Sequence, residues 1–253
     1  MSDALDGLPP LDVHAHIAPD VTTSQIEALG NSHTFAVTRS LEEARQVIHK
    51  SSRHITWGVG THPADTAAQV GFNEKTFITL LPRFGLIGEI GLDRRAGDLS
   101  RQTATLTSIL RIAADHPVLL SLHSAGAAGP LLDVLEQHPH PGAILHWWTD
   151  DGPDLDRAIA TGAYFSVNAA MKPTILKRLP TNRVLSETDF PAHKVGAHKP
   201  GDTHQIEQQL TALWKTDPKI TRHRIWVNLR QLATKAEALD RLPEPIADML
   251  LTV

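Results

Sequence analysis

Five segments of this chain place acidic and imidazole side chains where a metal-dependent hydrolase would need them. In each segment the acid or histidine lies at the end of a short apolar run or just after it. The segments are 12–16, 88–93, 122–123, 145–146 and 186–189. Fifteen histidines in 253 residues would produce a His-x-His pair by chance about once, so the repeated context is more informative than the His14-x-His16 pair alone. A fold that gathers strand ends at one face would bring these donors together around metal.

The apolar runs that carry these groups alternate with segments of helical spacing. Such alternation is typical of successive βαβ units and a parallel sheet. The predicted strands are Leu11–Val13, Thr34–Thr38, Ile55–Val59, Gly85–Ile90, Val118–Leu122, Ala143–His146, Ala163–Val167 and Arg183–Ser186. The predicted helices lie near 40–51, 73–82, 100–115, 126–138, 153–161, 172–179 and 203–215. Eight strands favour a closed (β/α)₈ TIM-type barrel over an open doubly wound sheet, and no G-x-G-x-x-G follows the first strand.

Composition sets limits on the class of protein. With 41% apolar and 21% charged residues, the chain can bury a substantial core. One domain over residues 1–253 is the simplest organisation, with two helices at about 219–252 packed on the barrel. No apolar run of eighteen residues and no signal-like N-terminus exist, so we expect a cytoplasmic protein without a membrane span. Because there is no cysteine, any metal must be held by nitrogen and oxygen donors.

The charge distribution leaves two interpretations open. The net charge is −4, which is not that of a typical nucleic-acid-binding protein. Residues 172–235, however, hold twelve Lys and Arg against five Asp and Glu. These basic residues could line a groove for an anionic substrate, or they could lie on solvated helix faces.

In a parallel barrel the carboxyl ends of all strands open on one face, where loops build the site. Six candidates map to that face: His14, His16, Glu89, His123, His146 and Asp189. Residues two apart in a strand point the same way, so His14 and His16 can both face the mouth. Glu89 would bury a carboxylate inside an apolar strand, which is costly without a metal or another strong partner. Such a set suits one or two divalent ions, namely zinc, magnesium or manganese.

Several motifs resemble those of the TatD-type metal-dependent deoxyribonucleases. They are His14-x-His16, Gly60-Thr61-His62-Pro63, Gly88-Glu89-Ile90-Gly91-Leu92-Asp93, the single histidines 123 and 146, and Glu187-Thr188-Asp189-Phe190-Pro191, in order over about residues 11 to 191. The segments 144–148 and 164–168 are similar to the TatD-type component of the Qat anti-phage systems. That resemblance implies antiviral defence and protein partners from a defence operon.

The resemblance also implies roles for individual residues. One ion would be held by His14, His16, Glu89 and Asp189, and Glu89 would bridge to a second ion held by His123 and His146. Asp189 would deprotonate the attacking water and, with Glu89 and His62, make up the catalytic set. His62 would bind substrate or assist the leaving group. Asp12 or Glu187 would hold an imidazole tautomer, and Asp93 would lie in a loop or support a ligand.

One position departs from the family pattern. The family usually has H-x-R-x-A after the fifth strand, whereas this chain has Ala125 where the arginine would stand. Its absence removes a bidentate phosphate contact that lysine would not fully replace. We expect Lys194 or Lys199, with His193 a further candidate, to compensate from the loop after Asp189.

Two tryptophans follow His146 directly, and only one of them can face the site because successive strand residues point apart. Trp147 could stack on a base of single-stranded DNA, or the pair could simply pack beneath a loop.

The leading hypothesis is a metal-dependent phosphodiesterase, favoured as a DNA exonuclease acting on single strands or 3′ ends. The alternatives are an amide or ester hydrolase, such as a D-aminoacyl-tRNA deacylase, and a non-catalytic barrel subunit of a defence complex. Cyclic amidohydrolases are disfavoured because they usually bridge two metals with a carboxylated lysine from the fourth strand, where this chain has Glu89.

Overall fold

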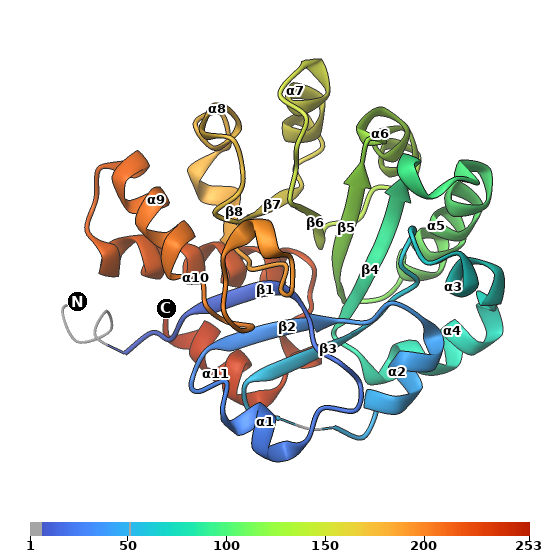
Figure 1. The fold of residues 1–253 in the computed structure, drawn as a ribbon, viewed down its shortest axis with the longest axis horizontal. Coiled ribbons are helices and arrows are strands. Elements are labelled where there is room, and N and C mark those ends of the chain that lie inside the picture. Colours follow the sequence, from blue (N-terminus) through green and yellow to red (C-terminus); the bar gives the residue numbers. More distant parts are fainter. Residues whose placement is uncertain (1–6, 51) are drawn as a thin grey trace.

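Eight parallel strands form a nearly closed barrel surrounded by helices, in a computed structural model that describes residues 7–50 and 52–253 (Figure 1). The strands pair in sequence order, β1 to β8. They are β1 Leu11–His16, β2 His33–Val37, β3 Ile55–Val59, β4 Leu86–Asp93, β5 Leu119–Ala125, β6 Ala143–His146, β7 Tyr164–Val167 and β8 Val184–Ser186. Beyond the end of β8, Asp189 N donates to His14 O (2.9 Å) and His16 N donates to Phe190 O (2.8 Å), which joins the last strand to the first. The predicted barrel fold is confirmed.

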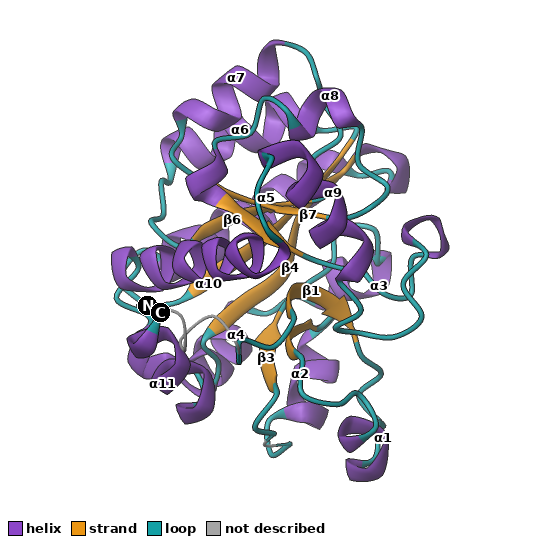
Figure 2. Cartoon of the chain, turned by 90° about the vertical axis from the view of Figure 1, so that its left-hand side faces the viewer, coloured by secondary structure: helices purple, strands orange, loops and turns teal. Residues whose placement is uncertain are grey.

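The helices form a layer outside the strands, as Figure 2 shows from the side. They are α1 Thr23–Glu27, α2 Leu41–Val47, α3 Thr66–Gly71, α4 Glu74–Leu80, α5 Leu99–Ala113, α6 Ala128–Gln137, α7 Pro153–Ala160, α8 Pro173–Leu176, α9 His204–Trp214, α10 Pro218–Lys235 and α11 Glu244–Thr252. Side-chain caps begin several of them: Ser40 accepts from Glu43 N before α2, and Asp98 accepts from Arg101 N before α5.

Two helices were missing from the sequence prediction. The helices α1 and α3 have five and six residues, too short for a clear amphipathic repeat. At the C-terminal end, α10 packs on α9, β8 and α11. Within α10, Asn228 Nδ2 donates to the carbonyls of Thr181 and Val184, while Trp226 Nε1 donates to Pro9 O. These bonds fasten α10 where β8 begins and where the chain enters β1.

Most of the core is aliphatic, and the strands are buried on both faces. Every residue of β2, β3 and β4 is buried, as expected of a parallel sheet covered by helices. None of the helices in the described ranges has the length and apolar composition needed to cross a bilayer.

Three strands extend further than predicted because each continues past its apolar run to the barrel mouth. The strand β1 continues to His16, β4 to Asp93 and β5 to Ala125. His14, His16 and His123 therefore lie within strands rather than after them, and Asp93 ends β4 instead of lying in a loop. The prediction was wrong there because it ended each strand where its apolar run stopped.

Two bulges occur in the strands that carry the central site residues. The pairing of β1 with β2 shifts register between Asp12 and Ala15, and that of β4 with β5 shifts between Ile87 and Ile90. Each shift inserts one residue, in stretches that contain His14 and Glu89. Bulges bend a strand and re-aim its side chains. Gly91 allows the close pairing after the second bulge, since a Cβ there would lie 2.1 Å from His123 O.

Candidate metal centre

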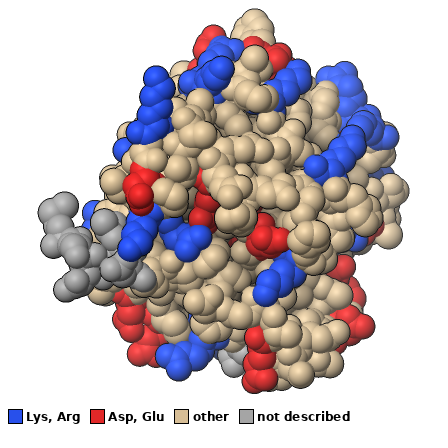
Figure 3. Space-filling view, turned by 60° about the vertical axis from the view of Figure 1, so that its left-hand side comes forward, with Lys and Arg blue, Asp and Glu red and all other residues tan. Residues whose placement is uncertain are grey.

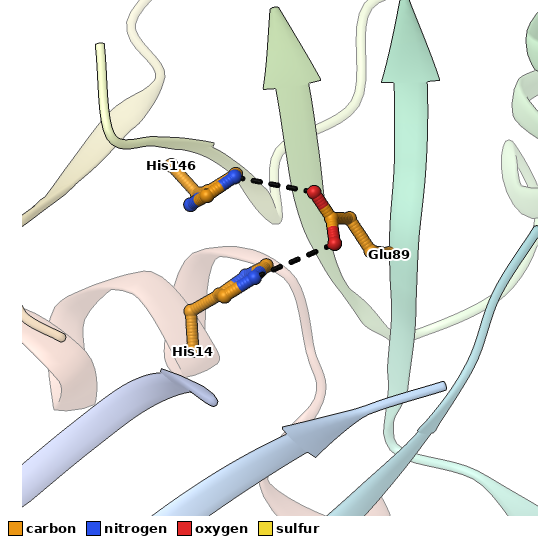
Figure 4. A group of neighbouring side chains, drawn as sticks. All are labelled: His14, Glu89 and His146. Atoms are coloured by element: carbon orange, nitrogen blue, oxygen red, sulfur yellow. Dashed lines mark ion pairs between the residues drawn. The ribbon is translucent and has the colours of Figure 1, made fainter. Parts of the chain in front are cut away.

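The carboxylate of Glu89 is the centre of a cluster of histidines at the carboxyl ends of the strands. Its side chain comes from β4 and is 1% exposed. In Figure 4, the imidazoles of His14 and His146 approach it from β1 and β6, each toward a different oxygen. The two oxygens of Glu89 therefore face two different sets of donors.

The first set, which we call the Oε2 side, consists of His14, His16, Asp189 and Glu89 Oε2. The distance from Glu89 Oε2 is 3.6 Å to His14 Nε2 and 3.1 Å to His16 Nε2. Asp189 Oδ1 lies 3.6 Å from His14 Nε2 and 3.7 Å from His16 Nε2. Two donors about 2.1 Å from one tetrahedral ion are about 3.4 Å apart, so this spacing fits a single ion.

The second set, the Oε1 side, consists of His123, His146 and Glu89 Oε1. His123 Nδ1 lies 2.6 Å and His146 Nε2 3.2 Å from Glu89 Oε1, and these two nitrogens are 3.3 Å apart. Carboxylates stand behind both rings. Asp93 Oδ2 lies 3.2 Å from His123 Nε2, and Glu187 Oε2 lies 3.5 Å from His146 Nδ1.

Unpartnered buried atoms indicate that the cluster is incomplete without a cation. In the described part of the chain, His14 Nε2 and Glu89 Oε2 are buried without a hydrogen-bond partner. Such groups cost free energy unless something satisfies them. Three groups of donors could each hold an ion: His14, Glu89 and His146; His14, His16 and Asp189; and His16, His62 and Glu89. The residues therefore fit one or two divalent ions.

Electrostatics within the cluster agree with this fit. Burial lowers the pKa of His14 to about 4, which keeps its ring neutral and able to bind metal. For Glu89, burial acts to raise the pKa, but the imidazoles of His62 and His123 foremost hold it well below its ordinary value. Burial raises the pKa of Asp189 to about 6, close to the pH at which a general base works best.

Supporting hydrogen bonds fix the orientation of several rings. Ser121 Oγ is hydrogen-bonded to His14 Nδ1 at 2.7 Å, which leaves Nε2 directed at Glu89. Glu187 is fully buried and accepts from Asn168 Nδ2 (2.9 Å), Trp147 N (3.1 Å) and Ser166 Oγ. Its Oε2 also lies 3.5 Å from His146 Nδ1, a nitrogen without a hydrogen-bond partner among the described residues. That Glu187 holds the tautomer of His146 stays a prediction. Ser121 was missed, although its place two residues before His123 puts both side chains on the same face of β5.

Asp12 has a different task from the one expected. Its carboxylate accepts from the backbone nitrogens of His14 (3.3 Å), Thr188 (2.9 Å) and Gly201 (2.8 Å) and from Thr188 Oγ1 (2.6 Å). Burial nevertheless raises its pKa to about 7. Asp12 holds β1 to the segment after β8, and among the described residues its carboxylate makes no hydrogen bond to an imidazole.

A cavity of about 300 Å³ opens beside the cluster. His123, His146 and Asp189 form its inner wall, and Ala125 and Trp147 also line it. Of the adjacent tryptophans, Trp147 faces the cavity, whereas Trp148 is fully buried and its Nε1 donates to Asp150 O. The Trp148 ring thus packs in the core, and the stacking of Trp147 on a base stays a prediction.

The structure separates the predicted phosphate-binding lysines. Lys194, in a short 3₁₀ turn at His193–Val195, lines the cavity. Lys199 instead donates to the carbonyls of Leu29 (2.8 Å) and Ala28 (3.4 Å) at the end of α1. His62 is with the cluster, since its Nε2 lies 3.2 Å from Glu89 Oε2. Arg95 also lines the cavity, and the sequence analysis did not single it out.

Comparisons with known proteins assign the chain to one family. A family model described as TatD related DNase matches residues 11–234. The 3′-5′ ssDNA/RNA exonuclease TatD of Enterobacter lignolyticus is 29% identical over 194 residues, which cover 68% of this chain and 72% of that protein. The protein of the same name from Escherichia coli K12 is 29% identical over 146 residues, covering 52% and 56% of the two chains.

Solved structures resemble the chain in fold. A TatD homologue from Escherichia coli K12, YjjV, superimposes with a TM-score of 0.73 at 18% identity, covering 88% of this chain and 96% of its own. A TatD-family hydrolase from Entamoeba histolytica gives a TM-score of 0.72 at 14% identity, covering 89% and 98%. At these identities the likeness concerns the barrel fold alone.

Proposed function

Because this chain belongs to the TatD-related DNase family, we propose that it removes nucleotides from the 3′ end of single-stranded DNA or RNA by metal-dependent hydrolysis. The chain is a hydrolase of phosphodiester bonds by its family membership. The proposed substrate and direction of digestion are supported by two relatives that are named as 3′-5′ ssDNA/RNA exonucleases. The observation that carries it is the position of Glu89, whose two oxygens face two separate sets of imidazoles.

The proposed ligands follow the two sides of Glu89. One ion would be held on the Oε2 side by His14, His16 and Asp189, and a second on the Oε1 side by His123 and His146. Bound there, the ions would supply Lewis-acid stabilisation and a lower pKa for water. Zinc, manganese and magnesium are the candidates, with the nitrogen-rich donor set favouring zinc.

The chain's own residues would do the remaining chemistry. Asp189 would accept the proton of the attacking water as the new P–O bond forms. The P–O3′ bond breaks, and the proton on the leaving oxygen would come from His62, whose side chain is 16% exposed beside Glu89. Trp147 would stack on the terminal base.

The basic residues of 172–235 do not form one binding surface for a nucleic acid on the face that Figure 3 draws. On the face drawn in Figure 3, Lys and Arg are interspersed with Asp and Glu and do not form one continuous basic patch. Several basic residues of 172–235 are paired: Lys172 with Asp151 (3.2 Å), and Arg222 with Glu207 (2.6 Å). We therefore propose that phosphate recognition is local to the cavity.

We further propose that the chain forms a single barrel domain, that it works in the cytoplasm, and that its protein partners come from a defence operon.

The test is an exonuclease assay on chelator-stripped protein reloaded with Zn²⁺, Mn²⁺ or Mg²⁺. Single-stranded DNA labelled at its 5′ end should shorten stepwise, and DNA blocked at its 3′ end should resist. Elemental analysis of the same samples should find one or two ions per chain. The Glu89→Gln protein is the control for a contaminating nuclease.

Two other results would replace this proposal. Metal-loaded protein that releases the amino acid from a D-aminoacyl-tRNA but leaves DNA and RNA intact would be a deacylase, an alternative that the loss of the arginine at Ala125 favours. Metal-loaded protein that acts on neither would be a non-catalytic barrel.

A further inference from the structure

Arg95 lies beside the position that lacks the family's arginine. In the pairing of β4 with β5, Asp93 is the register partner of Ala125. Arg95 follows Asp93 by two residues, in a 3₁₀ turn at Arg94–Ala96, and it lines the same cavity as Ala125. The Arg95 guanidinium and the guanidinium of an arginine placed at position 125 would thus extend from neighbouring positions in the cavity wall.

Asp93 holds the guanidinium of Arg95 in place. Its carboxylate accepts from Arg95 Nε (3.0 Å), Arg95 Nη2 (2.7 Å) and Arg95 N (2.8 Å). These bonds use one edge of the guanidinium. Within the described residues Nη1 makes no hydrogen bond, and the Arg95 side chain is 73% exposed although that of Asp93 is only 2% exposed. The opposite edge of the group is therefore free for a ligand.

The same carboxylate links Arg95 to the metal centre. Asp93 Oδ2 lies 2.7 Å from Arg95 Nη2 and 3.2 Å from His123 Nε2. Through Asp93, the guanidinium of Arg95 lies close to His123, the ring whose Nδ1 faces Glu89 Oε1. Guanidinium groups suit phosphate because they donate two parallel hydrogen bonds.

We propose that Arg95 binds a phosphate of the substrate, with Lys194 contributing a second positive charge from the loop after β8. Arg95 takes the part that an arginine at position 125 would otherwise have. This inference rests on the proposed function, because a phosphate is the group that a nucleic acid presents to this cavity. A role of the Arg95 side chain confined to its ion pair with the buried Asp93 carboxylate would leave substrate binding unchanged.

The test measures kcat, KM and the salt dependence of binding for single-stranded DNA. Arg95→Gln should raise KM about tenfold or more, since a charge-assisted hydrogen-bond pair is lost, while kcat changes less than about twofold. The slope of log binding constant against log salt should fall by about one. Arg95→Lys should keep the slope but bind more weakly than wild type, because lysine donates as a point charge.

Two further variants make the result specific. Arg101→Gln removes the same charge from an exposed ion pair with Asp98 outside the cavity lining and should behave as wild type. In the Arg95→Gln background, Ala125→Arg should restore much of the lost affinity.

The outcomes separate this inference from the proposed function. Wild-type protein that hydrolyses no nucleic acid contradicts the function itself. An active wild type whose Arg95→Gln variant keeps its KM and salt slope contradicts the inference and leaves the function standing. A variant that loses metal and kcat at unchanged KM also contradicts it, since Arg95 would then act through Asp93 and His123 alone.

Discussion

The two sides of the Glu89 carboxylate differ in how far the protein alone satisfies them. On the Oε2 side, His14 Nε2 and Glu89 Oε2 have no hydrogen-bond partner among the described residues. On the Oε1 side, His123 Nδ1 is hydrogen-bonded both to Glu89 Oε1 and to His146 Nε2. Donor atoms on the Oε2 side are therefore left unsatisfied by the protein alone, whereas those on the Oε1 side have internal contacts that an ion would replace.

Burial and support differ in the same direction. On the Oε2 side, the ring of His14 is fully buried, and its Nδ1 is hydrogen-bonded to the neutral hydroxyl of Ser121. The Oε1 side is backed by the carboxylates Asp93 and Glu187. Burial acts to lower the pKa of His146, but Glu187 and Glu89 raise it well above its ordinary value. We therefore expect the first ion to fill the Oε2 side and the second to bind more weakly on the Oε1 side.

The largest effect should come from removing what the two sides share. Glu89→Gln takes away the charge that faces both sets of donors, so we expect the metal content of both sides to fall. Because several kcal/mol of Lewis-acid stabilisation would be lost, kcat should drop at least about a thousandfold. Elemental analysis and the exonuclease assay measure this. Glu42→Gln, at an exposed helix residue, is the matched control. Full metal content in the Glu89→Gln protein would contradict the bridging position.

A smaller loss should follow from a change confined to the Oε2 side. Asp189→Asn preserves size but removes basicity, so turnover should fall at least about a hundredfold while the Oε1 side keeps its ion. Asp133→Asn, an exposed carboxylate on α6 paired with Arg157, should have little effect. Near-normal turnover of Asp189→Asn at full metal occupancy would mean that another group accepts the proton.

The smallest effects should separate the two sides. Ser121→Ala removes the support of His14, and Glu187→Gln removes the charge behind His146; each should weaken one ion about 10- to 100-fold. In a calorimetric titration, Ser121→Ala should shift the tighter step and Glu187→Gln the weaker one. Circular dichroism checks that both proteins fold. If both variants shift the same step, the two sides do not bind independently.

How far the sequence could predict the site depends on the residue. Glu89 and Asp189 were recognisable because an acid within an apolar run demands a partner wherever the chain folds. The positions of Lys194 and Lys199 were not distinguishable, since both follow Asp189 in one loop and only the path of that loop sends Lys199 to the end of α1. Arg95 was missed because no local pattern shows that it lines the cavity, although Asp93 was expected either in a loop or in support of a ligand.

The sequence by itself determined the barrel fold and the residue types, acids and histidines, that could bind metal. Eight apolar runs alternating with helices can close only a few ways, and a parallel barrel brings the acid and histidine at each strand end to one face. These features are local in the chain, so they are visible without coordinates.

Only the tertiary structure decided which oxygen of Glu89 faces which histidines. That division depends on the bulges in β1 and β4, each detectable only through the register of a neighbouring strand. It also depends on the contact of Asp93 in β4 with His123 in β5. Register and side-chain reach arise from contacts between residues far apart in the sequence, and no local pattern encodes them.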